Sequence, residues 1–267
     1  MVEKILKKFG QISKNTWNHL AKEDAEYYIL SDKSKKGGMW DKESFLSQGI
    51  KQWTELKKML GHYNLEEAVG KNKKALDMGC GVGRIAFSMA NDFQDIFGVD
   101  VAEIMIEKAN EYQKNLGINN VNFSVNNGID LFSFKDNFFD FVFSYIVLQH
   151  CPSEKQVLRY VKEFSRVLKP NGVCLFQTRV SPTFLWFLKF NIQKKVRRLK
   201  YIGKNNNYVK EAVMGNWVYY PKLYKVLKKH FKAFYIVQMP IEIYKKDFWE
   251  KNSEFDRWKR SFIICIK

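Results

Sequence analysis

Short apolar runs alternate along this chain with longer segments in which apolar residues recur at helical spacing. The runs lie at 75–78, 95–99, 121–125, 139–144 and 173–177. Between the second and third runs, Met105, Ala109 and Tyr112 are spaced as one face of a helix. Strands that alternate with helices predict an α/β fold, in which helices cover both faces of a mostly parallel sheet.

The pattern changes after the fifth run. A helix is predicted from Pro221 to His230, followed by strands Ala233–Gln238 and Ser261–Ile266, which would add an antiparallel edge to the sheet. Near the N-terminus, Leu46 and Trp53 fall at helical spacing and indicate a helical cap. The predicted division of the single domain is a cap over 1–70, a cofactor-binding core over 71–180, an insertion over 181–220 and a C-terminal part over 221–267.

Three glycines at alternate positions, Gly79, Gly81 and Gly83, follow the first predicted strand and precede a predicted helix. A backbone without side chains lets a ligand lie on the main chain, and the helix N-terminus presents unpaired N–H groups to it. This turn therefore predicts a cofactor site. A dinucleotide turn has its third glycine where this chain has Arg84, and the nearby carboxylate of Asp77 suits an ammonium or sulfonium better than a pyrophosphate.

A second acidic residue, Asp100, ends the next predicted strand, where a carboxylate can accept hydrogen bonds from ribose hydroxyls. Together with the glycine turn, this pattern resembles the class I S-adenosylmethionine-dependent methyltransferases of the type 11 methyltransferase domain family. The resemblance extends from Lys71 to Thr178 and includes the strand Phe138–Ser144 and the turn Val167–Val173. It implies a Rossmann-like fold with a seven-stranded sheet, S-adenosylmethionine as cofactor and S-adenosylhomocysteine as product.

The resemblance also implies which residues hold the cofactor. In the family, the first motif wraps the methionine half, the acid after the second strand holds the ribose, and an acidic residue in the third motif binds the adenine amino group. This chain has Asn127 at that last position, and its side-chain carbonyl can still accept a hydrogen bond from the amine. The implied cofactor-binding residues are Asp77, Gly79, Cys80, Gly81, Gly83, Asp100, Val101, Met105, Asn127, Gly128, Ile129, Ser144, Tyr145, Gln149 and Trp40.

His150 follows the fourth predicted strand, at the rim that faces the methyl group in the family. An imidazole can accept a proton from a hydroxyl acceptor at neutral pH, so His150 is the predicted catalytic base. The alternative is that His150 only shapes the pocket by binding a backbone carbonyl. The next candidates for substrate contact are Arg179, Tyr219, Tyr220 and Tyr28.

Charge is unevenly distributed in this chain of 267 residues, which has 45 basic and 28 acidic residues and a formal net charge of +17. No acidic residue occurs between Glu163 and Glu211, and the densest basic segment, Lys194–Lys200, lies in the insertion. In the family, insertions at this point commonly form a lid, which would here concentrate an anionic substrate. The alternatives are a solvated basic face, or contacts with nucleic acid.

No apolar run approaches the roughly 18 residues that span a bilayer, and the N-terminus has no signal-peptide pattern, so we expect a cytoplasmic protein. The four cysteines are widely spaced, which predicts reduced thiols and no metal site. The favoured hypothesis is O-methylation of a small anionic metabolite, such as a sugar, nucleotide-linked or phosphorylated acceptor. A tRNA methyltransferase and a non-catalytic cofactor-binding module are the alternatives, and the sequence does not determine the oligomeric state.

Overall fold

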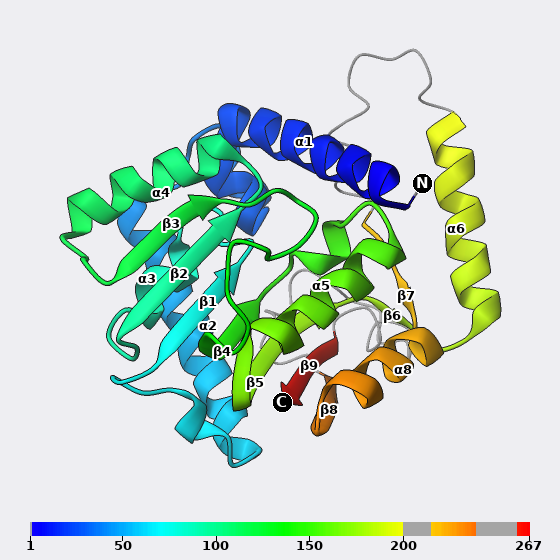
Figure 1. Ribbon diagram of the computed structural model, residues 1–267. Coiled ribbons are helices and arrows are strands. Elements are labelled where there is room, and N and C mark those ends of the chain that lie inside the picture. The colour runs from blue at the N-terminus through cyan, green and yellow to red at the C-terminus, as the bar shows by residue number, and fades with distance from the viewer. Residues whose placement is uncertain (1, 200–214, 239–260) are drawn as a thin grey trace.

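A computed structural model describes residues 2–199, 215–238 and 261–267, and within these ranges the centre of the molecule is a seven-stranded sheet (Figure 1). Its strands are hydrogen-bonded in the order β3-β2-β1-β4-β5-β9-β8, and β9 alone runs opposite to the other six. The mostly parallel sheet with an antiparallel edge is therefore confirmed. The strands are β1 (Lys74–Met78), β2 (Asp95–Asp100), β3 (Val121–Val125), β4 (Phe139–Ser144), β5 (Leu168–Thr178), β8 (Ala233–Gln238) and β9 (Ser261–Ile266).

Two hydrophobic clusters, one on each face of the sheet, hold the helices in place. Side chains alternate between the faces along β4, so Phe141 and Phe143 join the first cluster and Val142 joins the second. The first cluster is covered by α1 (Val2–Leu30), α2 (Lys42–His62), α3 (Arg84–Met89) and α4 (Glu103–Leu116), and the second by α5 (Glu154–Val167) and α8 (Tyr220–His230). Helices therefore cover both faces of the sheet, as the alternating pattern of strands and helices predicts.

The N-terminal segment is helical, and α1 lies across the edge of the sheet at which the parallel strands end (Figure 1). The helix bends at Asp24, whose backbone has extended dihedral angles. The carboxylate of Asp24 accepts hydrogen bonds from the N–H groups of Gly37 and Gly38, at 2.7 and 2.8 Å. These bonds tie the loop between α1 and α2 back onto α1. Short 3₁₀ helices lie at Lys33–Lys35, Glu66–Ala68 and Leu148–His150.

After β5 the chain forms a small two-stranded sheet from β6 (Val180–Ser181) and β7 (Val218–Tyr219), with α6 (Phe184–Leu199) beside it. The predicted insertion therefore contains a helix at the side of the molecule (Figure 1). Its remaining basic residues, Lys200, Lys204 and Lys210, lie outside the described residues. Among the helices that the structure describes, none is long and apolar enough to cross a membrane.

Candidate functional site

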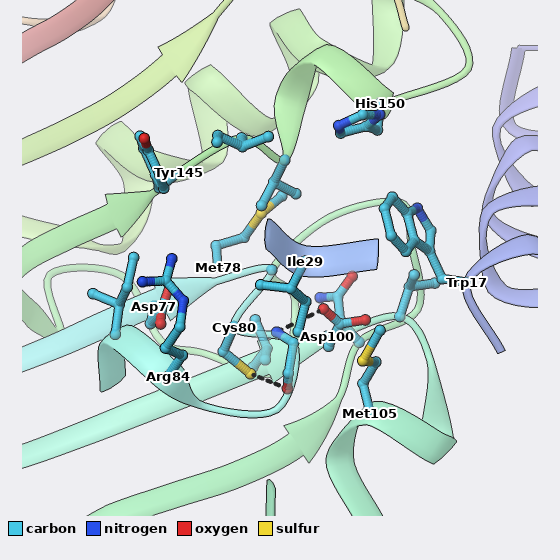
Figure 2. Close-up of a pocket in the computed structure, with 18 of the residues that line it drawn as sticks. Trp17, Ile29, Asp77, Met78, Cys80, Arg84, Asp100, Met105, Tyr145 and His150 are labelled. Carbon is cyan, nitrogen blue, oxygen red and sulfur yellow. Dashed lines mark hydrogen bonds between the residues drawn. The ribbon is translucent and has the colours of Figure 1, made fainter. Parts of the chain in front are cut away.

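A cavity of about 570 Å³ opens where β1, β2 and β4 end, beneath α1 (Figure 2). Its size is within the range of small-molecule and cofactor sites. Parallel sheets bind ligands at this edge because the loops after the strands leave a crevice there. The predicted residues that line the cavity are Asp77, Gly79, Cys80, Gly81, Asp100, Val101, Met105, Gly128, Tyr145, His150 and Tyr28.

The glycine turn between β1 and α3 forms the floor of the cavity. Gly79, Gly81 and Gly83 all have positive φ angles, of 81°, 54° and 85°, a conformation that other residues rarely adopt. A Cβ atom at Gly79 would overlap the side chain of Val147, and one at Gly81 would lie 2.8 Å from Cδ1 of Ile29. The backbone of the turn is thus open to a ligand only because these positions are glycine.

Asp100, at the end of β2, is held against this turn by hydrogen bonds. Its Oδ2 accepts from the N–H of Gly81 at 3.0 Å, and its Oδ1 accepts from the N–H of Ala102 at 2.9 Å. Burial raises the pKa of the Asp100 carboxyl, and these backbone hydrogen bonds oppose that rise. Each carboxylate oxygen keeps a second lone pair, so Asp100 can also accept from ligand hydroxyls in the cavity.

Asp77 lies at the opposite end of the turn, on β1, and is only 3% exposed. Burial raises the pKa of its carboxyl to about 7, the neighbouring Arg84 acts to lower it, and Asp100 acts to raise it. Arg84 is itself buried, and its Nη2 donates to Oε1 of Gln52 at 2.8 Å. Near neutral pH, the Asp77 carboxyl is therefore partly protonated, and a cation bound in the cavity would favour its ionised form.

One face of α2 lines the cavity, which our sequence analysis did not predict. Gln48, Lys51, Gln52 and Glu55 are spaced i, i+3, i+4 and i+7 and therefore lie on the same side of the helix. This helix contacts α3 closely at Gly49, where a Cβ atom would overlap the backbone oxygen of Arg84. The helical spacing of these polar residues is present in the sequence, but the same spacing is typical of a solvent-exposed helix face and therefore does not indicate a cavity.

The structure places Asn126, rather than Asn127, on the cavity. The Asn126 Oδ1 accepts from the N–H of Gly128 at 2.7 Å and from the Tyr160 hydroxyl at 3.1 Å. Asn127 is exposed, and its Oδ1 accepts from the N–H groups of the two residues after Gly128, at 2.7 and 3.0 Å. The Asn127 side chain therefore closes its own turn, as asparagine commonly does.

His150 ends the short helix after β4 and faces the cavity (Figure 2). Its ring meets the Trp17 indole of α1 edge to face, with the centroids 5.4 Å apart. The Nε2 atoms of His150 and Gln149 lie 3.1 Å apart. Because a glutamine Nε2 can only donate, this contact makes the His150 Nε2 the acceptor, so its lone pair is free for a substrate proton only when the hydrogen bond with Gln149 is broken.

Residues 70–246 match the family described as "Methyltransferase domain", which is more than half of the chain. The chain belongs to this methyltransferase domain family. A demethylmenaquinone methyltransferase of Geobacillus kaustophilus is 33% identical over 122 residues, which are 45% of this chain and 50% of that protein. A ubiquinone biosynthesis O-methyltransferase of Rickettsia felis is 28% identical over 176 residues, 66% of this chain and 61% of that protein. The matched part of the chain thus spans about half the length of the first of these curated relatives.

Solved structures show the same fold. The YcgJ protein of Bacillus subtilis superposes with a TM-score of 0.56 at 17% identity, over 83% of this chain and 98% of that one. The geranyl diphosphate C-methyltransferase of Streptomyces coelicolor, crystallised with S-adenosylhomocysteine, superposes with a TM-score of 0.51 at 13% identity, over 88% of this chain and 87% of that one. The Rossmann-like methyltransferase fold expected from the sequence is confirmed.

Some residues that the sequence analysis assigned to the site lie outside the cavity lining. Ser144 is buried behind it and donates to the backbone oxygen of Met78 at 2.9 Å, while Trp40 packs against Phe45. Tyr219 contacts Phe184 and Phe187 of α6 instead. The predicted residues away from the lining are Gly83, Asn127, Ile129, Ser144, Gln149, Trp40, Arg179, Tyr219 and Tyr220.

Tyr28 is the predicted substrate residue that does reach the cavity. Burial and a hydrogen bond with Glu23 raise the pKa of its hydroxyl to about 12. Tyr28 therefore stays protonated at neutral pH, and because its O–H donates to Glu23, its hydroxyl oxygen is left to accept a hydrogen bond from a ligand. Trp17, Lys51 and Asn126 also line the cavity, although the sequence analysis assigned none of these residues to the site.

Proposed function

We propose that the protein is an S-adenosylmethionine-dependent methyltransferase acting on a small acceptor. The observation that carries this proposal is the glycine turn bounded by two carboxyl groups, Asp77 and Asp100, on one cavity. S-adenosylmethionine would supply a methyl group already activated by its sulfonium. Membership in the methyltransferase domain family and the S-adenosylhomocysteine of the Streptomyces structure support the same cofactor.

The cavity residues fit that cofactor group by group. Gly79 and Gly81 line the cavity with bare backbone on which a ligand can lie, and no other residue fits there, because a Cβ atom would overlap Val147 or Ile29. Asp100 can bind the ribose hydroxyls, and Asp77 can bind the ammonium of the methionine part. A dinucleotide fits less well, because Asp77 would repel a pyrophosphate beside the turn.

For the acceptor we propose a small molecule with a hydroxyl group and an anionic group. His150 is placed to take the hydroxyl proton, because its ring faces the cavity and its Nε2 lone pair becomes available once the acceptor displaces Gln149. Lys51 at the cavity and the net charge of +17 support an anionic acceptor. The O-methyltransferase name of the Rickettsia relative supports transfer to oxygen. Alignment of the acceptor in the cavity would supply much of the rate, on the order of 7–11 kcal/mol in well-oriented systems.

Calorimetry with S-adenosylhomocysteine and with NAD tests the proposal. We expect saturable binding of S-adenosylhomocysteine and none of NAD. Transfer of a labelled methyl group to a panel of hydroxylated acceptors, with and without a carboxylate or phosphate, then tests the acceptor class. Binding of NAD without S-adenosylhomocysteine would refute the cofactor assignment. Transfer only to uncharged acceptors would refute the proposed anionic acceptor but not the proposed cofactor.

A further inference from the structure

Helix α6 presents large apolar side chains to solvent. Leu185 is 76% exposed, Ile192 is 53% exposed and Leu188 is 42% exposed. Their spacing of three and four residues places them on one side of the helix, which we call the apolar stripe of α6. Single exposed leucines are common in proteins, but a contiguous stripe marks a surface that is covered in use.

The stripe faces outward because the other side of α6 holds the helix to the domain. Phe187 packs against Tyr219, with the ring centroids 5.9 Å apart, and Phe190 packs against Trp217 at 5.8 Å. The phenylalanines fix the rotation of the helix about its axis. Figure 1 shows α6 at the side of the molecule, standing away from the central sheet. None of its described side chains lines the cavity.

All charged residues in the sequence of α6 are basic. The α6 sequence, FLWFLKFNIQKKVRRL, has five basic residues and no acidic one, and it lies in the acid-free interval between Glu163 and Glu211. Lys189 lies with its Nζ 6.0 Å from the ring centroid of the exposed Trp186. Tryptophan and lysine together suit a membrane interface, because each has an apolar body and a polar end.

We propose that α6 docks on the surface of an anionic lipid bilayer, with the apolar stripe in the headgroup region and Lys189 beside lipid phosphates, and that the net positive charge of the helix sequence favours anionic lipids. Exposed leucines, a tryptophan and exclusively positive charge on one helix are the features of interfacial helices. An anionic bilayer can bury the apolar stripe and also pair with the positive charge of α6. An apolar groove on a protein would bury the stripe but leave that charge unpaired. This inference does not depend on the methyl acceptor or on the cofactor.

Vesicle flotation tests the proposal with the full chain. One set of vesicles is pure phosphatidylcholine, and the other contains about 30% phosphatidylglycerol, both in about 0.1 M NaCl. We expect binding to the anionic vesicles and at least tenfold weaker binding to the neutral ones. The variants Leu185→Glu and Ile192→Glu should each lower the affinity for anionic vesicles at least tenfold.

The matched control is Leu116→Glu, which places the same charge at another exposed leucine, at the end of α4. Its vesicle affinity should stay within about twofold of the wild type, the size of a single-charge effect away from the docking surface. Circular dichroism and S-adenosylhomocysteine binding establish that each variant is folded.

Three results would overturn the proposal. The first is absence of binding of the folded wild type to anionic vesicles, and the second is equal loss of binding in Leu185→Glu and Leu116→Glu. The third is a dimer in light scattering that Leu185→Glu dissociates, without vesicle binding, which would assign the stripe to a second copy of the chain. Steeply salt-dependent binding to bulk tRNA, with no binding to vesicles, would instead favour nucleic acid.

Discussion

The imidazole of His150 meets the indole of Trp17 edge to face, with the centroids 5.4 Å apart and the ring planes at 83°. Trp17 lies on the cap helix α1 and His150 on the short helix after β4, so the contact joins the cap to the edge of the sheet where the cavity opens (Figure 2). Edge-to-face pairs are favoured by ring electrostatics, on the order of 0.5–1.5 kcal/mol. The cap thereby orients the proposed base, as well as closing the cavity.

If His150 removes a proton from the acceptor, His150→Ala should lower kcat by about 10²-fold or more. The affinity for S-adenosylhomocysteine should stay close to the wild-type value, because the proposed cofactor contacts of Asp77 and Asp100 lie on β1 and β2. The control is His62→Ala, which removes an exposed imidazole at the end of α2. Steady-state kinetics with calorimetry would decide. Wild-type kcat in His150→Ala would show that His150 only shapes the pocket.

Asp100→Ala should weaken S-adenosylhomocysteine binding by about 1.5–3 kcal/mol, the typical value of hydrogen bonds to a charged group. The loss includes the ribose contact and the two backbone bonds that hold the glycine turn. Asp95→Ala, at the other end of the same strand, removes an ion pair with Lys74 far from the cavity and should leave the affinity unchanged. Equal dissociation constants for Asp100→Ala and wild type would show that Asp100 does not bind the ribose.

The cofactor affinity should rise with pH between about 5.5 and 7.5. Burial raises the pKa of Asp77 to about 7, so below that pH the carboxyl is protonated and a bound ammonium must displace the proton. Each pH unit below the pKa then weakens binding by up to about tenfold. Calorimetry in two buffers of different ionisation enthalpy would measure the released proton. Asp77→Asn should show a flat profile, and an unaltered slope in that variant would assign the proton to another group.

Two glycines of α2 should respond to alanine with opposite signs. A Cβ atom at Gly49 would overlap the backbone oxygen of Arg84, so Gly49→Ala should lower the free energy of unfolding by about 1–3 kcal/mol. Gly61 has no atom within 4 Å of an added Cβ, and Gly61→Ala should raise that free energy by up to about 1 kcal/mol. Denaturant unfolding measures both. Destabilisation of similar size in the two variants would show that helix packing at Gly49 is not the cause.

Much of the fold could be predicted because it depends on local patterns. The strands Ala233–Gln238 and Ser261–Ile266 occur with the predicted bounds, since short apolar runs of strand length are local features of the sequence. The order of strands in the sheet was available only through the resemblance. The periodicity of apolar residues indicates which residues are buried, but not which strands are neighbours in the sheet.

The sequence by itself determined the glycine turn and the positions of Asp77 and Asp100, because these features depend on a few consecutive residues at the ends of strands. Only the tertiary structure decided that Asn126 faces the cavity in place of Asn127, because a shift of one residue after a strand turns a side chain to the other side. The same holds for the polar face of α2 and for Trp17. Their roles come from packing between segments far apart in the chain, which no local pattern of residues records.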